Sequence, residues 1–287
     1  MMVTLHSHRK LILLLGVAIC VTLIPSFARA HEGLHEQIEA ITAKIKRDPK
    51  NAALYLQRGE LYRLHREWTR AAADYERASR LQPGLTIVDL GRGKMLLESR
   101  RFKQAKVVLD RFLGQQPRHV EGLVTRGRVL AKIGARLDAA NDFTEALALA
   151  PTPEPELYLE RAQVLAGDER YTHEALRGLD EGIKQLGPVV TLELAVIDLE
   201  LRESNYDAAL TRLDVITAQS ERKEPWLVRR GEILKAAGSY EEARKAFTAA
   251  IVAIDSLPPE RRQSRTISAL QLRARTALKS ELTPRLQ

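Results

Sequence analysis

The sequence predicts an all-α solenoid of about six helix–turn–helix units, with a capping helix at each end. Proline and glycine recur every 34 residues and in step with one another. Between them, apolar residues fall three, four and seven positions apart, which is the spacing of one helix face. Aromatic residues make up only 5% of the chain. That composition suits long helices better than sheets.

The first thirty residues have the features of a signal peptide. Arg9 and Lys10 form a basic start, and the apolar run from Leu11 to Ile24 follows. The run is shorter than the roughly 20 residues of a membrane-spanning helix. Ala28-Arg29-Ala30 matches a cleavage site, so we expect a periplasmic or secreted protein that begins at His31. The alternative is an uncleaved inner-membrane anchor formed by residues 11–27.

Cysteine and charge limit the function classes. The only cysteine, Cys20, lies in the predicted signal peptide, so the mature chain would have neither a disulfide nor a catalytic thiol. Residues 259–287 carry seven basic and two acidic side chains, whereas residues 31–258 are neutral in sum. A nucleic-acid-binding array would need a basic stripe along its body. We therefore expect no nucleic-acid partner.

Residues 31–51 are predicted to form the N-terminal capping helix. A terminal unit of a solenoid has an apolar face without a neighbour, which a capping helix covers. The apolar stripe expected to do so consists of Leu34, Ile38, Ile41 and Ile45. The helix should end before Pro49, because proline cannot continue it.

Residues 52–258 contain the six repeats, which start near residues 52, 86, 120, 155, 190 and 224. The prolines that set the period are Pro49, Pro83, Pro117 and Pro151. Three glycines keep the same spacing, each preceded by arginine: Gly59, Gly93 and Gly127. Each proline should end the second helix of a unit, and a break such as Gly134 or Gly238 should separate the unit's two helices.

Small residues are expected where the two helices of a unit cross. Glycine inside a helix costs about 0.5–1 kcal/mol relative to alanine, so its recurrence needs a packing reason. The predicted close pairs are Gly59–Ala71, Gly93–Ala105, Gly127–Ala139 and Gly231–Ala243. The large residues one turn later would fill the space towards the next unit, namely Tyr75, Leu109, Phe143, Leu179, Leu213 and Phe247.

Residues 259–287 are predicted to form a basic C-terminal capping helix and tail, after Pro258-Pro259. Its apolar stripe comprises Ile267, Leu270, Ala274, Ala277 and Leu278. Two helices in each of six units and one cap at each end give about 14 helices.

The small, large and proline positions resemble those of the tetratricopeptide repeat. The resemblance covers residues 52–258 and is weakest in the fourth and fifth units, where Ala162 and Ile197 replace the glycine. It implies a right-handed α-solenoid. In this family the first helices of successive units line a concave groove, and extended peptides or helices commonly bind there.

The predicted groove has an apolar floor and a mixed-charge wall. Its aliphatic positions are Leu56, Leu90, Val124, Leu159, Leu194 and Val228. The polar positions four residues later are Glu60, Lys94, Arg128, Gln163, Asp198 and Glu232, and Arg63 and Leu97 follow on the same face. We expect a protein or peptide partner, and neither a small-molecule substrate nor a cofactor. The alternative is that the aliphatic residues pack between adjacent helices.

The basic tail is a second candidate surface. It carries Arg261, Arg262, Arg265, Arg273, Arg275 and Lys279. These side chains suit an acidic partner or anionic lipid headgroups. The alternative is a solvated face of the capping helix.

One motif offers a different function. His31-Glu32-Gly33-Leu34-His35 matches H-E-x-x-H, the zinc-peptidase signature. That chemistry also needs a third ligand and a buried helix, whereas chain termini fray. His31 and His35 are therefore weak candidates for metal binding or delivery, and weaker ones for catalysis. The sequence favours a non-catalytic interaction scaffold or adaptor outside the cytoplasm.

Overall fold

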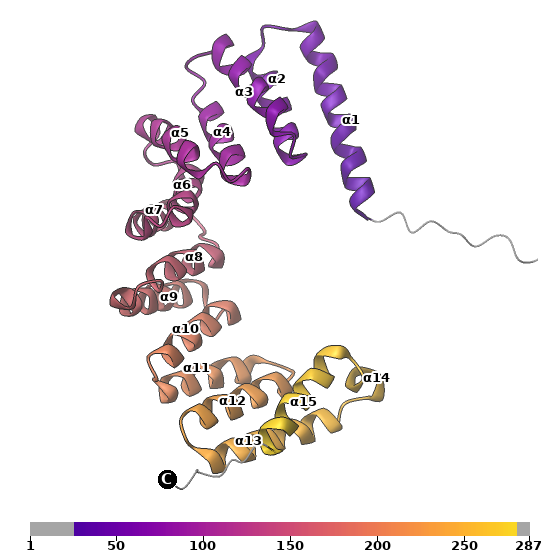
Figure 1. Cartoon of the computed structure of the whole chain (residues 1–287), viewed down its shortest axis with the longest axis vertical. Coiled ribbons are helices and arrows are strands. Elements are labelled where there is room, and N and C mark those ends of the chain that lie inside the picture. The colour runs from indigo at the N-terminus through magenta and orange to yellow at the C-terminus, as the bar shows by residue number, and fades with distance from the viewer. Residues whose placement is uncertain (1–25, 280–287) are drawn as a thin grey trace, which may run out of the picture. The chain divides into compact units, whose positions relative to one another are not determined.

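The structure is a computed structural model that describes residues 26–279. These residues form helices and connecting turns, without strands (Figure 1). The all-α solenoid class is thus confirmed. The chain divides into two compact units, Met1–Gly91 and Arg92–Gln287, which we call unit 1 and unit 2. The predicted signal segment from Leu11 to Ile24 lies outside the described residues.

Unit 1 contains the first hairpin and the helix that covers it. Its helices are α1 (Ser26–Arg47), α2 (Ala52–Leu64), α3 (Trp68–Leu81) and the first part of α4 (Ile87–Glu98). Helix α2 packs against both α1 and α3. Ile38 and Ile45 of α1 are buried, as expected for a capping helix. Helix α1 runs through the predicted cleavage site after Ala30.

Unit 2 continues the series of hairpins. After α4 come α5 (Phe102–Gln115), α6 (Val120–Lys132), α7 (Arg136–Leu149), α8 (Pro155–Leu165), the 3₁₀ turn η1 (Glu169–Tyr171), α9 (Thr172–Leu186), α10 (Val190–Arg202), α11 (Tyr206–Gln219), α12 (Glu224–Ala236), α13 (Tyr240–Asp255), α14 (Pro259–Arg262) and α15 (Arg265–Lys279). From α5 to α13 each helix packs on the next, and α15 packs on α12 and α13. The four-residue helix α14 is the one helix beyond the 14 expected in this part of the chain.

A left-handed residue separates the two helices in five of the six hairpins. The residues with positive φ at these turns are Arg66, Arg100, Gly134, Ser204 and Gly238. Only Gly134 and Gly238 could be recognised from the sequence, because the other turns use residues that rarely adopt this conformation. In the fourth hairpin η1 replaces the turn.

The glycines of the first helices do not face the predicted alanines most closely. A Cβ on Gly127 would lie 2.7 Å from the Phe143 ring, and Leu109 and Phe247 cover Gly93 and Gly231 in the same way. The nearest neighbours of these glycines are therefore the large residues one turn after the predicted alanines. Helical side chains tilt towards the N-terminus of their own helix. The large side chain therefore reaches back to the height of the alanine one turn earlier, and there it contacts the glycine of the first helix.

Arginines preceding these glycines tie the hairpins together. Arg126 donates two hydrogen bonds to Asp142, at 2.7 and 2.8 Å, and one to Asp110 of the preceding hairpin, at 3.2 Å. The hydrogen bonds to Asp142 raise the pKa of Arg126 above its usual value. In the fourth hairpin, Arg161 donates instead to the Gly178 carbonyl and the Glu181 carboxylate. The same arginine position thus keeps its bonding role where the repeat pattern changes.

Candidate functional site

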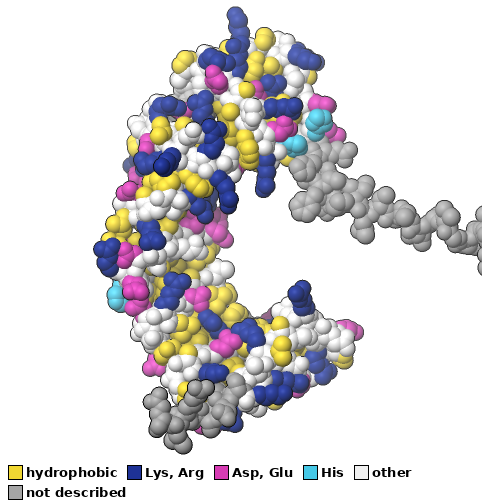
Figure 2. Space-filling view, viewed as in Figure 1, with side chains coloured by type: hydrophobic (Ala, Val, Ile, Leu, Met, Phe, Trp, Pro, Cys, Tyr) yellow, Lys and Arg dark blue, Asp and Glu magenta, His cyan; other side chains and the backbone are white. Residues whose placement is uncertain are grey.

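The first helices of unit 2 expose a partly apolar face. Val124, Leu159 and Leu194, from α6, α8 and α10, are half-buried, as are Leu97 and Lys94 of α4. In Figure 2, exposed hydrophobic side chains lie beside charged ones on unit 2. Half-buried aliphatic residues flanked by charges fit the predicted groove floor and wall at these positions.

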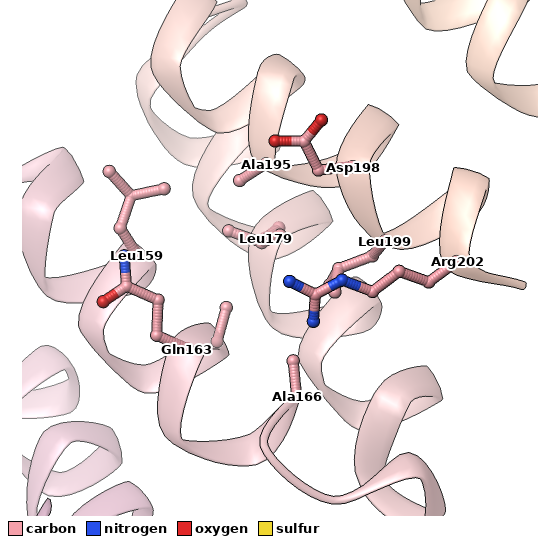
Figure 3. Close-up of a pocket in the computed structure, with 9 residues that line it drawn as sticks. Leu159, Gln163, Ala166, Leu179, Ala195, Asp198, Leu199 and Arg202 are labelled. Carbon is pink, nitrogen blue, oxygen red and sulfur yellow. The ribbon is translucent and has the colours of Figure 1, made fainter. Parts of the chain in front are cut away.

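A hollow of about 220 Å³ lies between α8 and α10 (Figure 3). Its lining residues are Leu159, Ala162, Gln163, Ala166, Leu179, Ala195, Asp198, Leu199 and Arg202. Three of them, Leu159, Gln163 and Asp198, are predicted groove residues. In Figure 3 the guanidinium of Arg202 reaches back from α10 across the hollow. The hollow therefore combines an aliphatic lining with a cation at its edge.

A second hollow, of about 420 Å³, lies between α4, α6, α7 and α8. Its lining residues are Leu97, Arg128, Ala131, Lys132, Phe143, Glu160, Gln163 and Val164. Gln163 lines both hollows, so they are neighbours on the same face. Together they form a surface along α4, α6, α8 and α10, which we call the groove.

Ion pairs join the first helices along most of this face. Lys94 of α4 pairs with Glu121 of α6, and Arg128 of α6 pairs with Glu160 of α8 at 2.8 Å. The hydrogen bonds to Glu160 raise the pKa of Arg128. The predicted charged wall is thus partly engaged within the protein itself.

The series of ion pairs continues at the other end of unit 2. Asp198 of α10 accepts from Arg229 of α12 at 2.7 Å, and Glu232 of α12 accepts from Arg273 of α15. Within the described residues, no such pair joins α8 to α10. The smaller hollow lies at this junction. Arg202 and Lys132 make no ion pair in the described part of the chain, so their charges remain available to a ligand.

Two predicted floor residues are not on the surface. Leu90 is 1% exposed and Val228 is 0% exposed, so neither can contact a ligand in this conformation. Val228 packs with Phe247 and Ile267 in the cluster beneath α15. At these two positions the aliphatic side chain packs between adjacent helices, which is the alternative to a groove floor.

The predicted residues of unit 1 have internal partners. Glu60 accepts a hydrogen bond from the Tyr75 hydroxyl at 2.7 Å and another from Arg63 at 3.0 Å. Leu56 is half-buried beside them on α2. Burial and the hydrogen bond to Glu60 raise the pKa of Tyr75. Glu60 thus holds Tyr75 in place, and the two hollows of unit 2 are the stronger candidate site.

Two family models match the sequence. A tetratricopeptide repeat-like domain matches residues 152–269, and a tetratricopeptide repeat matches residues 38–85. The chain belongs to the tetratricopeptide repeat family. No curated protein matches it.

Solved tetratricopeptide repeat proteins share the fold at low identity. The C-terminal part of a repeat protein from Cytophaga hutchinsonii is 13% identical, with a TM-score of 0.64, and the match covers 85% of this chain and 97% of that one. A repeat protein from Parabacteroides merdae is 20% identical, with a TM-score of 0.52 and coverage of 87% and 96%. PilW, a type IV pilus biogenesis factor, is 21% identical, with a TM-score of 0.54 and coverage of 68% and 91%. At these identities the likeness concerns the fold.

Sequence reasoning missed Arg202 and Lys132, the two groove cations that make no ion pair in the described part of this repeat protein. Arg202 follows Asp198 by four residues and so shares its helix face, and Lys132 follows directly after Ala131, which lines the larger hollow. The helical spacing indicates on which face these two cations lie. Whether a cation has an ion-pair partner depends on the residues of the neighbouring helices, and the spacing does not show those.

Of the two candidate metal-binding histidines, the structure describes the side chain of His35. His35 lies 3.3 Å from Glu39 on α1, and both side chains are largely exposed. Among the side chains that the structure describes, no group of three His, Cys, Asp or Glu could hold a metal ion. The side chain of His31 lies outside them. No helix between residues 26 and 279 is long and apolar enough to cross a membrane.

Proposed function

We propose that this tetratricopeptide repeat protein is a non-catalytic adaptor that binds a segment of a partner protein in the groove of unit 2. The observation that carries this proposal is the pair of neighbouring hollows that share Gln163. Each has an aliphatic lining and one cation without an ion-pair partner. Such a surface suits an extended or helical segment, whose side chains enter successive hollows.

The chemistry of the hollows defines the segment. Leu159, Ala166 and Ala195 line the smaller hollow, and Leu97, Ala131 and Val164 line the larger one. An aliphatic side chain would lose exposed apolar area on entering either hollow. A carboxylate beside it would meet Arg202 or Lys132 and form a charge-assisted hydrogen bond. We therefore expect a partner segment in which aliphatic and acidic residues lie close together.

Site-specific cross-linking tests the groove. A photoreactive amino acid at Gln163 is compared, in the source cells, with one at Gln104, an exposed glutamine on the second helix α5. The Gln163 position should give a discrete adduct that the Gln104 position does not. Arg202→Glu should reduce that adduct at least tenfold, because it repels the carboxylate and places a second anion beside Asp198.

A matched charge reversal controls for net charge. Arg177 of α9 is exposed and makes no ion pair within residues 26–279, so Arg177→Glu should leave the adduct unchanged. Equal adduct yields from wild type and a folded Arg202→Glu variant would refute the groove proposal.

We also propose that the protein acts outside the cytoplasm, after export by residues 1–30. This proposal is supported by the basic start, the apolar run of 14 residues and the Ala28-Arg29-Ala30 pattern. Mass spectrometry of the protein from fractionated cells should show an N-terminus at His31. A chain that keeps residues 11–27 and sediments with membranes would support the anchored alternative.

A further inference from the structure

The outward face of the C-terminal capping helix is a second distinctive surface. Helix α15 buries Ile267, Leu270 and Ala274 against α12 and α13. Positions seven residues apart lie on one helix face, so Arg265, Leu272 and Lys279 form a stripe on the opposite side. These three side chains are exposed, as is Arg275 beside them. We call these four residues the basic stripe.

The basic stripe has few internal counter-charges. Residues 259–279 contain six basic side chains and one acidic side chain, Glu260. Arg273 donates to Glu232. The other five cations make no ion pair within the described residues, and they are Arg261, Arg262, Arg265, Arg275 and Lys279. Figure 2 shows Lys and Arg side chains over this end of unit 2.

A large apolar side chain lies in the middle of these charges. Leu272 is 67% exposed, which makes it the most exposed large hydrophobic residue in the described part of the chain. It lies two helical turns from both Arg265 and Lys279. At a membrane interface, cations lie at the headgroups and apolar side chains below them; the apolar face of α15 packs on α12 and α13, so Leu272 is the large apolar side chain that this surface offers.

We propose that the basic stripe docks on an anionic lipid surface. Such a surface attracts each nearby Lys or Arg, and each cation strengthens adsorption by about fivefold. Leu272 would enter the acyl boundary and add apolar burial. Binding of single-stranded nucleic acid is less well supported, because residues 259–279 contain no aromatic side chain on which a base could stack. This inference does not depend on the groove proposal.

Vesicle binding tests the proposal on the full chain. Neutral phosphatidylcholine vesicles are compared with vesicles containing 30% phosphatidylglycerol, a composition on the order of the anionic content that attracts basic segments. Because residues 1–30 are present in every variant, their contribution is constant. Wild type should prefer the anionic vesicles, and salt at ten times the physiological level should remove that preference.

Charge reversal locates the contact. Arg265→Glu, Arg275→Glu and Lys279→Glu together should weaken anionic-vesicle binding by at least about a hundredfold, because three attractive charges are lost and three repulsive ones are added. The control reverses three exposed cations elsewhere in unit 2, namely Lys103, Arg118 and Arg177. It has the same net charge and should bind within about twofold of wild type. If the control loses as much binding as the stripe variant, or the stripe variant loses none, the proposal is wrong.

A fluorescent probe reports the contact directly. Leu272→Cys carries an environment-sensitive dye in a Cys20→Ser background, so the labelled position is the only cysteine. Its emission should shift to shorter wavelength on anionic vesicles. The same dye at Val107, which is 65% exposed on α5, should not respond. No shift at position 272, or tighter binding to a 30-nucleotide single strand than to vesicles, would overturn the lipid assignment.

Discussion

Single residues decide how closely the helices of each hairpin approach. Gly127 lies beneath the ring of Phe143, and Gly231 beneath that of Phe247. Both rings are almost fully buried. Glycine weakens the first helix at these positions, but it lets a large aromatic side chain fill the interface. The recurrence of glycine thus reflects the packing of a large side chain against the first helix.

This packing predicts opposite effects for two glycine-to-alanine changes. In Gly127→Ala the added Cβ would lie 2.7 Å from the Phe143 ring, and overpacking of this kind costs about 1–3 kcal/mol. Gly114→Ala in α5 meets no atom within 4 Å and should stabilise the helix by about 0.5–1 kcal/mol. Urea unfolding followed by circular dichroism measures both. A Gly127→Ala variant as stable as Gly114→Ala would contradict this account.

Tyr75 joins packing to a hydrogen bond. Its ring fills the space beside Gly59 and Gly91, and its hydroxyl donates to Glu60. Tyr75→Phe should cost about 1.5–3 kcal/mol at neutral pH, the net value of a hydrogen bond to a carboxylate. Tyr206→Phe is the control, because the Tyr206 hydroxyl makes no hydrogen bond in the described part of the chain.

Alkaline pH provides a second test of Tyr75. Its pKa in the folded protein is raised by burial, whereas the unfolded chain has the ordinary value of about 10. The stability that this raised pKa contributes is therefore fully present below about pH 10, and it is lost as pH rises above that value. Tyr75→Phe should lose less stability than wild type between about pH 9 and 11. Parallel curves for the two proteins would contradict the assigned environment.

Among the secondary-structure elements, the turns inside the hairpins contain avoidable strain. Arg100 and Ser204 adopt positive φ of 61° and 60°, where Gly134 and Gly238 occupy the equivalent turns. The left-handed conformation costs a non-glycine residue roughly 1–2 kcal/mol. Arg100→Gly should therefore raise the free energy of unfolding by about 0.5–1 kcal/mol, after the entropy of the unfolded glycine is subtracted. Gly134→Ala should lower it, and thermal unfolding distinguishes the two signs.

Buried ion pairs join the two helices of a hairpin. The Asp142 carboxylate accepts two hydrogen bonds from Arg126 and is 5% exposed. Asp142→Asn keeps the shape but removes the charge, which should cost about 1–3 kcal/mol. Glu145→Gln on the exposed side of α7 should change stability by less than about 0.5 kcal/mol. If both substitutions have the same small effect, the ion pair contributes little to stability.

Short-range patterns predicted the helices better than they predicted the site. The proline–glycine period and the apolar spacing indicated the hairpins, because both reflect contacts within one hairpin. Exposure of the groove residues depends on contacts between neighbouring hairpins. Leu90 and Val124 occupy equivalent repeat positions, yet Leu90 is buried and Val124 is half-buried. Likewise, the side chains nearest to the glycines, such as Phe143 at Gly127, depend on the direction of helical side chains as well as on spacing.

For the whole molecule, the contacts of a solenoid run mainly between neighbouring helices. Within unit 2 each hairpin packs on the next, and α15 closes the series on α12 and α13. In such an array, stability is close to a sum of repeat and neighbour terms, so damage at one end should remain local. The capping helix therefore offers a direct test of how far unfolding spreads.

Ile267→Ala in α15 should loosen the C-terminal end alone. Ile267 is 2% exposed and packs in a cluster with Phe247 and Ile254, so its truncation should cost about 2–5 kcal/mol locally. Hydrogen exchange should accelerate in α12, α13 and α15 and remain unchanged in α2 and α3. Leu272→Ala on the exposed side of α15 should leave every helix protected. If exchange accelerated equally throughout the chain, the array would behave as a single cooperative block, because loss of one end contact would then be transmitted through every hairpin.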